Sequence, residues 1–222
     1  MVDVALTTPA PASPTAVHPK MAASVFEHLQ LAKIQSLLKL EGIVGLLLAK
    51  TLYYLSSSIF AAVFMLAAVD RFGMQADSMG FLLAFIGITF GISQGVITGI
   101  VSAHFSDKTL NRVTNAVMAI GYAALAWTAS TTNLYLVLTP VLITSAVYNT
   151  INMAQLTKCV PETEYGSILA LEMVLAAATR LVSSALAGVL LNSPLGWGGV
   201  CAACSFFKVV CVFLFFTNRI YH

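Results

Sequence analysis

The sequence predicts an all-α membrane protein whose helices cross the bilayer six times. Hydrophobic residues make up 59% of the chain and charged residues only 9%, against roughly 25% charged residues in a soluble globular domain. The hydrophobic residues gather in six long runs that are separated by short charged or turn-forming links. Because backbone amides must be paired inside the hydrocarbon layer, each long run is expected to be a helix.

The six expected spans are long enough for a bilayer, since about 20 apolar residues cross the hydrocarbon core. They lie at residues 43–68, 79–103, 113–129, 134–156, 165–191 and 198–216. The links between them are short, so consecutive helices should be antiparallel neighbours. The sequence therefore predicts a six-helix transmembrane bundle over residues 42–222.

Residues 1–41 differ in composition and are expected to form a cytoplasmic N-terminal tail. The first 20 residues contain four prolines and no long apolar run, which is typical of disordered chain and unlike a signal peptide. Within 25–40, Lys33 and Lys39 alternate with apolar residues. This segment is expected to be an amphipathic helix on the membrane surface or an extension of the first span.

The basic residues predict that both termini are cytoplasmic. Placing the N-terminus inside leaves only Arg71 outside among the basic residues of the tails and links, as the positive-inside rule requires. The basic residues then inside are Lys20, Lys33, Lys39, Lys108, Arg112, Lys158 and Arg219. Trp127, Tyr135 and Trp197 fall at the outer boundary, where aromatic side chains are enriched. Plasma and organelle membranes are both compatible with this topology.

Several classes of function find no support in the sequence. The net charge of +2, without a basic run that contains aromatics, does not favour a nucleic-acid partner. Neither a GxSxG motif nor a phosphate-binding glycine pattern outside the spans occurs, so an enzyme is not expected. We expect no cofactor and no metal site, and we expect the cysteines to pack as small hydrophobic residues. The four cysteines are Cys159, Cys201, Cys204 and Cys211.

The second span carries a glycine ridge. Gly87, Gly91, Gly95 and Gly99 follow one another at intervals of four residues, and Ala103 continues the series. Small residues at this spacing allow another helix to approach closely within a membrane. The ridge is therefore expected to serve static helix packing, or a sliding contact used when a transporter changes state.

The fourth span carries a polar stripe. Ser145, Tyr148, Asn149, Asn152 and Gln155 recur at intervals of three or four residues and share one helix face. Such a face is costly in contact with lipid, so it should face protein or water. Hydrogen bonding between helices and contact with a substrate explain the stripe equally well.

Four ionisable residues fall inside the expected spans: Lys50, Glu172, Arg180 and Lys208. Arg180 lies near the middle of its span, where a charge needs a partner or a cavity, so it is the first candidate for a substrate or coupling residue. A buried carboxylate without a strong partner can exchange protons, which makes Glu172 a candidate for proton coupling. The alternative for Glu172 is a fixed ion pair with Lys50 or Arg180.

Several stretches resemble the C-terminal half of the organic-cation-transporter-like members of solute carrier family 22, which are major-facilitator proteins. Residues 94–112 read QGVITGIVSAHFSDKTLNR and are similar to the end of the eighth helix and the following loop. Residues 72–85, FGMQADSMGFLLAF, resemble the entry to the same helix. Lys158, Gly166 and Arg180 match the spacing around the tenth and eleventh helices.

The resemblance implies one half of a major-facilitator fold, with a central cavity and alternating access. It further implies transport of organic cations, by proton antiport. Helices seven, eight, ten and eleven would face the cavity, and these correspond to the first, second, fourth and fifth spans. Ser183 and Ser184 stand where the family tends to have a Gly-Pro pair, so a bend at that point is not expected from this sequence.

Two functional hypotheses follow. The first is a secondary active transporter, present as a half-length chain that pairs with a second copy of itself or with a complementary half. The alternative is a truncated membrane protein that does not transport and that binds partner proteins or a full-length transporter. The expected surroundings are a small-molecule substrate and the lipid bilayer.

Overall fold

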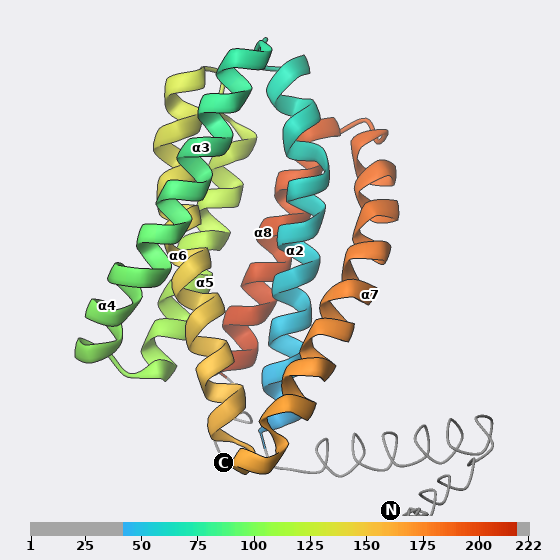
Figure 1. Ribbon diagram of the computed structural model, residues 1–222. Coiled ribbons are helices and arrows are strands. Elements are labelled where there is room, and N and C mark those ends of the chain that lie inside the picture. Colours follow the sequence, from blue (N-terminus) through green and yellow to red (C-terminus); the bar gives the residue numbers. More distant parts are fainter. Residues whose placement is uncertain (1–41, 217–222) are drawn as a thin grey trace, which may run out of the picture. The chain divides into compact units, whose positions relative to one another are not determined.

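The computed structural model describes residues 42–216, which form helices joined by short links and contain no strand (Figure 1). The expected tail of residues 1–41 and the expected inside position of Arg219 lie outside the described residues. The elements are α2 (Ile43–Asp70), α3 (Ala76–Ile92), the π-helix η1 (Ser93–Ile97), α4 (Thr98–His104), α5 (Asp107–Ala126), α6 (Thr131–Lys158), the 3-10 helix η2 (Glu162–Glu164), α7 (Tyr165–Leu191) and α8 (Gly196–Phe216).

Local signals in the sequence fix several helix boundaries. Ser106 and Ser130 cap α5 and α6, because their hydroxyl groups accept hydrogen bonds from the backbone N–H groups of Thr109 and Asn133. Gly73 takes a positive φ of 61° in the link after α2, a conformation that glycine adopts without strain. Consecutive long helices run up and down, as the short links require (Figure 1).

Five of the long helical segments are long and apolar enough to cross a bilayer: α2, the continuous 76–104 segment of α3, η1 and α4, then α6, the segment from η2 through α7, and α8. The chain is therefore a multi-pass membrane protein. The expected span at 113–129 is not among them. It falls mostly within α5, which begins earlier at Asp107 and carries Lys108, Asn111 and Arg112 in its first two turns.

Helix α5 exposes apolar side chains on its outward face and buries both polar and apolar side chains on its inward face. Val113 and Ile120, seven residues apart, are 51% and 70% exposed. Thr114 and Asn115 are buried on the opposite side, where α5 packs between α6 and α8. A helix on a water-soluble protein would have the reverse arrangement.

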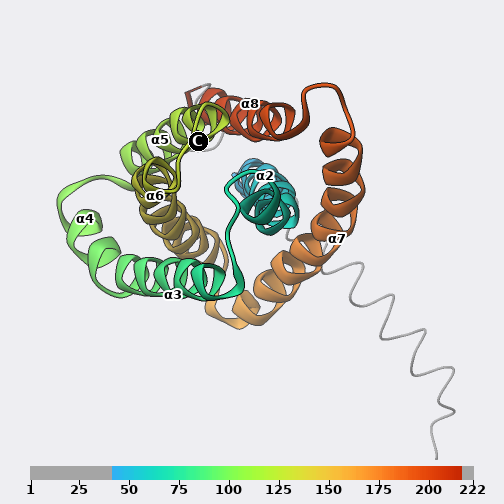
Figure 2. The same ribbon diagram turned by 90° about the horizontal axis from the view of Figure 1, so that it is seen from above.

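The described helices divide into two groups by how much of their surface they bury. Helices α2, α5, α6 and α8, here termed the core bundle, are joined by the packing of α8 on α2 and α5 and of α5 on α6, and α2 lies inside an arc of the other helices (Figure 2). The α3–α4 segment and α7, here termed the outer helices, bury far less. Within α3 only Leu82 is buried. Helix α7 rests on α2 along a single stripe formed by Ile168, Glu172, Ala176, Thr179, Ser183 and Ala187.

Helix α7 continues without interruption through Ser183 and Ser184. The Ser183 hydroxyl donates to the Leu55 carbonyl at 3.4 Å, and the Ser184 hydroxyl donates to the Arg180 carbonyl one turn earlier at 3.0 Å. This agrees with the absence of a Gly-Pro pair, because both serines retain the backbone N–H that a helix uses.

Candidate functional site

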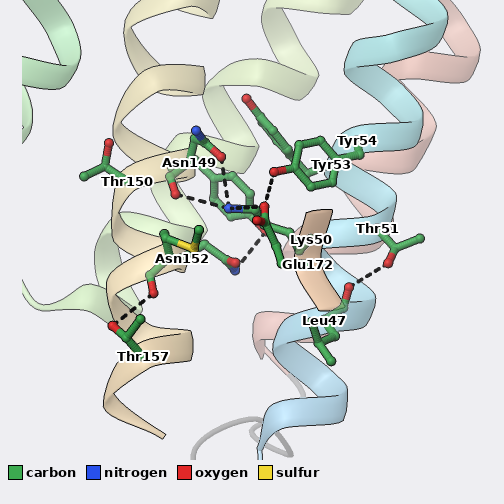
Figure 3. A network of polar contacts seen from close by, with 12 residues as sticks. Leu47, Lys50, Thr51, Tyr53, Tyr54, Asn149, Thr150, Asn152, Thr157 and Glu172 are labelled. Atoms are coloured by element: carbon green, nitrogen blue, oxygen red, sulfur yellow. Dashed lines mark hydrogen bonds and ion pairs between the residues drawn. The ribbon is translucent and has the colours of Figure 1, made fainter. Parts of the chain in front are cut away.

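An ion pair inside the bundle joins α2 to α7. The Lys50 Nζ lies 3.7 Å from Glu172 Oε1, and the two side chains are only 2% and 6% exposed (Figure 3). The fixed pair with Lys50 is therefore the arrangement of Glu172 in this structure. Two buried charges are tolerated in such surroundings only when each satisfies the other and further polar groups assist them.

Asn149 and Tyr54 supply the further polar groups. Lys50 Nζ donates to Asn149 Oδ1 at 2.9 Å and to the Asn149 backbone carbonyl at 3.2 Å. The Tyr54 hydroxyl donates to Glu172 Oε1, the same oxygen that faces Lys50. Lys50 thus holds two amide oxygens more closely than it holds the carboxylate (Figure 3).

A cavity of about 810 Å³ opens beside this ion pair. Its walls come from α2, α3, η1, α6 and α7, and they include Glu172 but not Lys50. The lining residues are Tyr54, Gly91, Gln94, Gly95, Asn149, Thr150, Met153, Ala154, Thr157 and Glu172. An ionisable side chain that is buried in a membrane protein and borders a cavity is a candidate functional residue.

A second cavity of about 670 Å³ shares Tyr54 and Asn149 with the first. Arg180 and Ser184 contribute to its wall from α7, and Tyr53 contributes from α2. Arg180 is exposed in the described structure, so the cavity, rather than an ion pair, accommodates its charge. Its role in function stays a prediction.

Some residues of the polar stripe of α6 form hydrogen bonds between helices, and others border a cavity where a substrate could make contact. Asn149 faces the cavities and holds Lys50. Ser145 shares a 2.6 Å hydrogen bond with Tyr53 from α2. Gln155 Oε1 accepts a hydrogen bond of 2.8 Å from Asn111 of α5.

Tyr148 and Asn152 lie on the protein side of the stripe and are fully buried. The Asn152 amide lies 3.4 Å from the Tyr148 hydroxyl, and the Tyr148 ring packs 4.8 Å from the Tyr53 ring. Substrate contact therefore has a geometric basis at Asn149, whereas Tyr148 packs against Tyr53 of α2 and Asn152 bonds to Tyr148 within α6.

The glycine ridge is not covered by any helix within residues 42–216. Gly87, Gly91, Gly95 and Gly99 are exposed, and a Cβ placed on any of them would meet nothing within 4 Å. Gly91 and Gly95 border the 810 Å³ cavity. Static packing within the described chain therefore does not explain the ridge. Its role as a contact for another helix stays a prediction.

A π-helix in the middle of the ridge has no counterpart in the prediction from the sequence. Residues Ser93–Ile97 form η1, and the Thr98 hydroxyl donates to the Ser93 carbonyl at 2.8 Å. Such single π-turns are frequent at functional sites. Gln94 and Gly95, both within η1, line the large cavity.

A second buried cation lies next to the site on α8. Lys208 is fully buried, and its Nζ lies 3.9 Å from the centroid of the Tyr53 ring. Within residues 42–216 this nitrogen has no hydrogen-bond partner, so the aromatic face stabilises its charge. The sequence identifies Lys208 as an ionisable residue inside the last span and gives it no role, and the structure shows that its aromatic partner comes from another helix, α2.

The fold and the site together define a multi-pass helical membrane protein with paired charges beside an open cavity. In comparisons with known proteins, the chain is similar to solute carriers. It is 28% identical over 171 residues to "Solute carrier family 67 member A1" of Homo sapiens, a match that covers 77% of this chain and 40% of the relative. It is 29% identical over 171 residues to "Solute carrier family 22 member 18" of Mus musculus, covering 77% and 41%.

These matches confirm the resemblance that residues 72–85 and 94–112 predict. The rat protein "Solute carrier family 22 member 18" is similar to the same extent, with 28% identity over 170 residues. The chain spans about two fifths of the length of these curated relatives. No protein-family profile matches the chain, and no solved structure matches it.

Proposed function

We propose that this chain is one half of a secondary active transporter of organic cations, which exchanges its substrate for protons. The observation that carries the proposal is the buried carboxylate of Glu172 at the wall of an 810 Å³ cavity between apolar helices. A carboxylate in such surroundings attracts a cation, because the helices around it screen its charge less than bulk water does. The similarity to solute carriers supports the same class of function.

The cavity offers an organic cation two kinds of contact. Glu172 supplies the negative charge, and the Tyr54 ring, which already lies 5.5 Å from Lys50 Nζ, can receive a cation on its face. Met153 and Ala154 offer apolar surface to the substituents of the cation. Arg180, in the neighbouring cavity, is proposed as a second coupling residue.

Transport requires that α5 also crosses the membrane, giving six spans and two cytoplasmic termini. The outward stripe of Val113 and Ile120 supports this topology, because these apolar side chains would face lipid. In support of the orientation, the 3.1 Å ion pair of Lys158 with Asp107 joins the end of α6 to the start of α5, which also carries Lys108 and Arg112. That end would be cytoplasmic by the positive-inside rule.

Cysteine labelling tests the topology. In a chain with Cys159 replaced by serine, Phe105→Cys and Ala129→Cys place single exposed thiols on either side of α5. Cys201, Cys204 and Cys211 are fully buried and should not react. A reagent that cannot cross the membrane should label the two positions from opposite sides. Labelling of both positions from one side would contradict the sixth span.

A flux measurement in proteoliposomes tests the proposed function. Radiolabelled tetraethylammonium should accumulate against an imposed pH gradient when the chain is present. Glu172→Gln should abolish this uptake, because it removes the negative charge at the cavity wall. Glu162→Gln is the matched control, since Glu162 is an exposed glutamate outside the cavity. Absence of uptake by folded wild-type protein would contradict transport by this chain alone.

A half transporter needs a second wall for its pathway. We propose that another half, either a second copy or a complementary chain, covers the exposed glycine ridge of α3–α4, where helices can approach closely. The ridge would then serve as the sliding contact during alternating access. The same exposed ridge favours the second candidate function, a membrane protein that does not transport and that binds partners or a full-length transporter.

The two candidate functions differ in a measurable way. A transporting pair should give uptake that rises with dimer content, measured by the molar mass of the detergent-solubilised protein. A binding protein should co-purify with a full-length relative and give no uptake of its own.

A further inference from the structure

We propose that Lys50 is a tethered counter-ion of Glu172, and that a cation bound at Glu172 expels the proton of Lys50. This inference rests on the proposed cation site and identifies the group that supplies the exchanged proton. It replaces Glu172 by Lys50 as the residue that gains and loses the proton, whereas Glu172 remains the ionised ligand throughout.

The two charges differ in their placement relative to the cavity. Glu172 lines the cavity and Lys50 does not, although their Nζ and Oε1 atoms lie 3.7 Å apart. A cation that arrives from the cavity therefore meets the carboxylate at a wall that Lys50 does not line. It competes with Lys50 for the same negative charge.

Lys50 has hydrogen-bond acceptors other than Glu172. Its Nζ lies 2.9 Å from Asn149 Oδ1 and 3.2 Å from the Asn149 carbonyl oxygen, both closer than the carboxylate. These two acceptors hold the nitrogen whether it is an ammonium or a neutral amine, because both forms can donate. Lys50 can therefore lose its ion pair with Glu172 and stay in position through its hydrogen bonds to Asn149.

The net charge of the buried site would change when a cation binds. When the site is empty, Glu172 and Lys50 neutralise each other. A bound organic cation would leave one uncompensated positive charge beside a lysine that is only 2% exposed, and an uncompensated buried charge is costly. Release of one proton from the Lys50 ammonium restores neutrality.

The exchange is balanced in atoms and charge. Before binding, the site holds the Glu172 carboxylate and the Lys50 ammonium, and the organic cation is in water. After binding, the carboxylate faces the organic cation, Lys50 is a neutral amine held by Asn149, and one proton has passed to water through the cavity. No bond other than the N–H bond of Lys50 breaks.

The other ionisable groups around Lys50 favour this direction. On α2 and the helices packed against it, the titratable or charged groups near this position are Tyr53, Tyr54, Tyr148, Glu172, Arg180, Cys204, Lys208 and Cys211. Within residues 42–216, Glu172 is the one carboxylate that lies within ion-pair distance of Lys50. Lys208 and Arg180 are cations and not anions, so neither compensates for an additional cation.

The proton count on wild-type protein is the first measurement. The chain is placed in lipid nanodiscs, in weak buffer with a pH indicator, and titrated with tetraethylammonium, whose charge does not depend on pH. We expect about one proton released for each bound cation, and an affinity that rises about tenfold per pH unit over the range of release. Binding without proton release would overturn the inference.

Lys50→Arg assigns the proton. An arginine preserves the ion pair with Glu172 but cannot lose its proton in a protein. We expect at least roughly tenfold weaker binding of tetraethylammonium, no proton release and a flat pH profile. Lys158→Arg is the matched control, since Lys158 forms an exposed ion pair with Asp107, and it should behave as wild type. Proton release by Lys50→Arg equal to that of wild type would overturn the inference.

Infrared difference spectroscopy on wild-type protein gives an answer that does not depend on a variant. If the proton comes from Lys50, adding tetraethylammonium should not remove a carboxylic-acid carbonyl band, because Glu172 is ionised before and after. Loss of such a band, absent in Glu172→Gln, would assign the proton to Glu172 and overturn the inference. If folded wild-type protein binds no tetraethylammonium at all, the proposed cation site fails rather than the assignment of the proton.

Discussion

The core bundle and the outer helices differ in where they place their polar and small residues. The core bundle turns polar side chains inward: Asn115 is buried on α5, and Ser56 is buried on α2. The outer α3–α4 segment exposes its glycines and buries only Leu82 within α3. In lipid, hydrogen bonds and close packing hold helices together. The core bundle therefore stabilises the fold, whereas the α3–α4 segment leaves a face open to contact with another helix.

The candidate site lies where the two groups meet. Lys50 and Asn149 belong to the core bundle, whereas Glu172 belongs to the outer helix α7. The ion pair therefore ties a sparsely packed helix to the well-packed one beside it. A cation that took Glu172 from Lys50, as proposed, would change how α7 is held on α2.

The largest effect on stability should come from breaking the contact between the two groups. Glu172→Leu leaves Lys50 buried without a counter-ion, which costs about 3–5 kcal/mol. Arg180→Gln alters an exposed charge on the same helix and should stay within about 0.5 kcal/mol of wild type. The apparent midpoint of thermal unfolding in detergent, at one scan rate, measures both.

A double variant checks the reason for that loss. Lys50→Leu combined with Glu172→Leu removes both charges and should recover most of the stability that Glu172→Leu loses, because well-packed apolar residues can replace a buried pair. A double variant less stable than either single variant would mean that the ion pair is not the cause.

Glycine substitution should separate the two groups next. A Cβ at Gly121 of α5 would overlap Val141 Cγ2 of α6, so Gly121→Ala should cost about 1–3 kcal/mol through overpacking. Gly91→Ala, on the outer α3, meets nothing within 4 Å and should not destabilise. Val141→Ala should rescue Gly121→Ala. Equal midpoints of thermal unfolding for the two glycine variants would contradict the proposed difference in packing.

The two tryptophans offer a finer comparison. Trp197 of α8 is 6% exposed and donates from its indole nitrogen to the Leu125 carbonyl at 3.0 Å. Trp197→Phe should cost about 1 kcal/mol for that hydrogen bond. Trp127 is 80% exposed, so Trp127→Phe should cost less than about 0.5 kcal/mol. Each variant retains one tryptophan, and its fluorescence should be quenched by brominated lipid at Trp127 but not at Trp197.

The smallest effect on stability is expected at the ridge, where a different property should change. Gly95→Leu adds a side chain to an open face and should leave the unfolding midpoint of the monomer nearly unchanged. If another half docks on the ridge, this variant should lower dimer content in detergent, measured by molar mass. Val96→Leu, an exposed neighbour, is the control. Unchanged association in Gly95→Leu would exclude the ridge as the contact.

The membrane-spanning segments could largely be predicted from the sequence, and α5 shows where the prediction weakens. Expected spans such as 165–191 coincide with a helix, because run length and backbone pairing are properties of one segment. Helix α5 buries polar residues such as Asn111 and Asn115 and carries charges near its start, so apolar content alone does not identify it as a span. Only its partners α6 and α8 define which face is buried.

The sequence by itself determined that charged and polar side chains lie inside apolar helices, and that Glu172, Arg180 and Asn149 deserve a functional hypothesis. The tertiary structure decided that Glu172 pairs with Lys50, that Asn149 faces a cavity while Tyr148 does not, and that the glycine ridge stays uncovered. The physical reason is that helix periodicity fixes which residues share a face. The rotation and depth of each helix, which decide which faces meet, depend on packing among all of them.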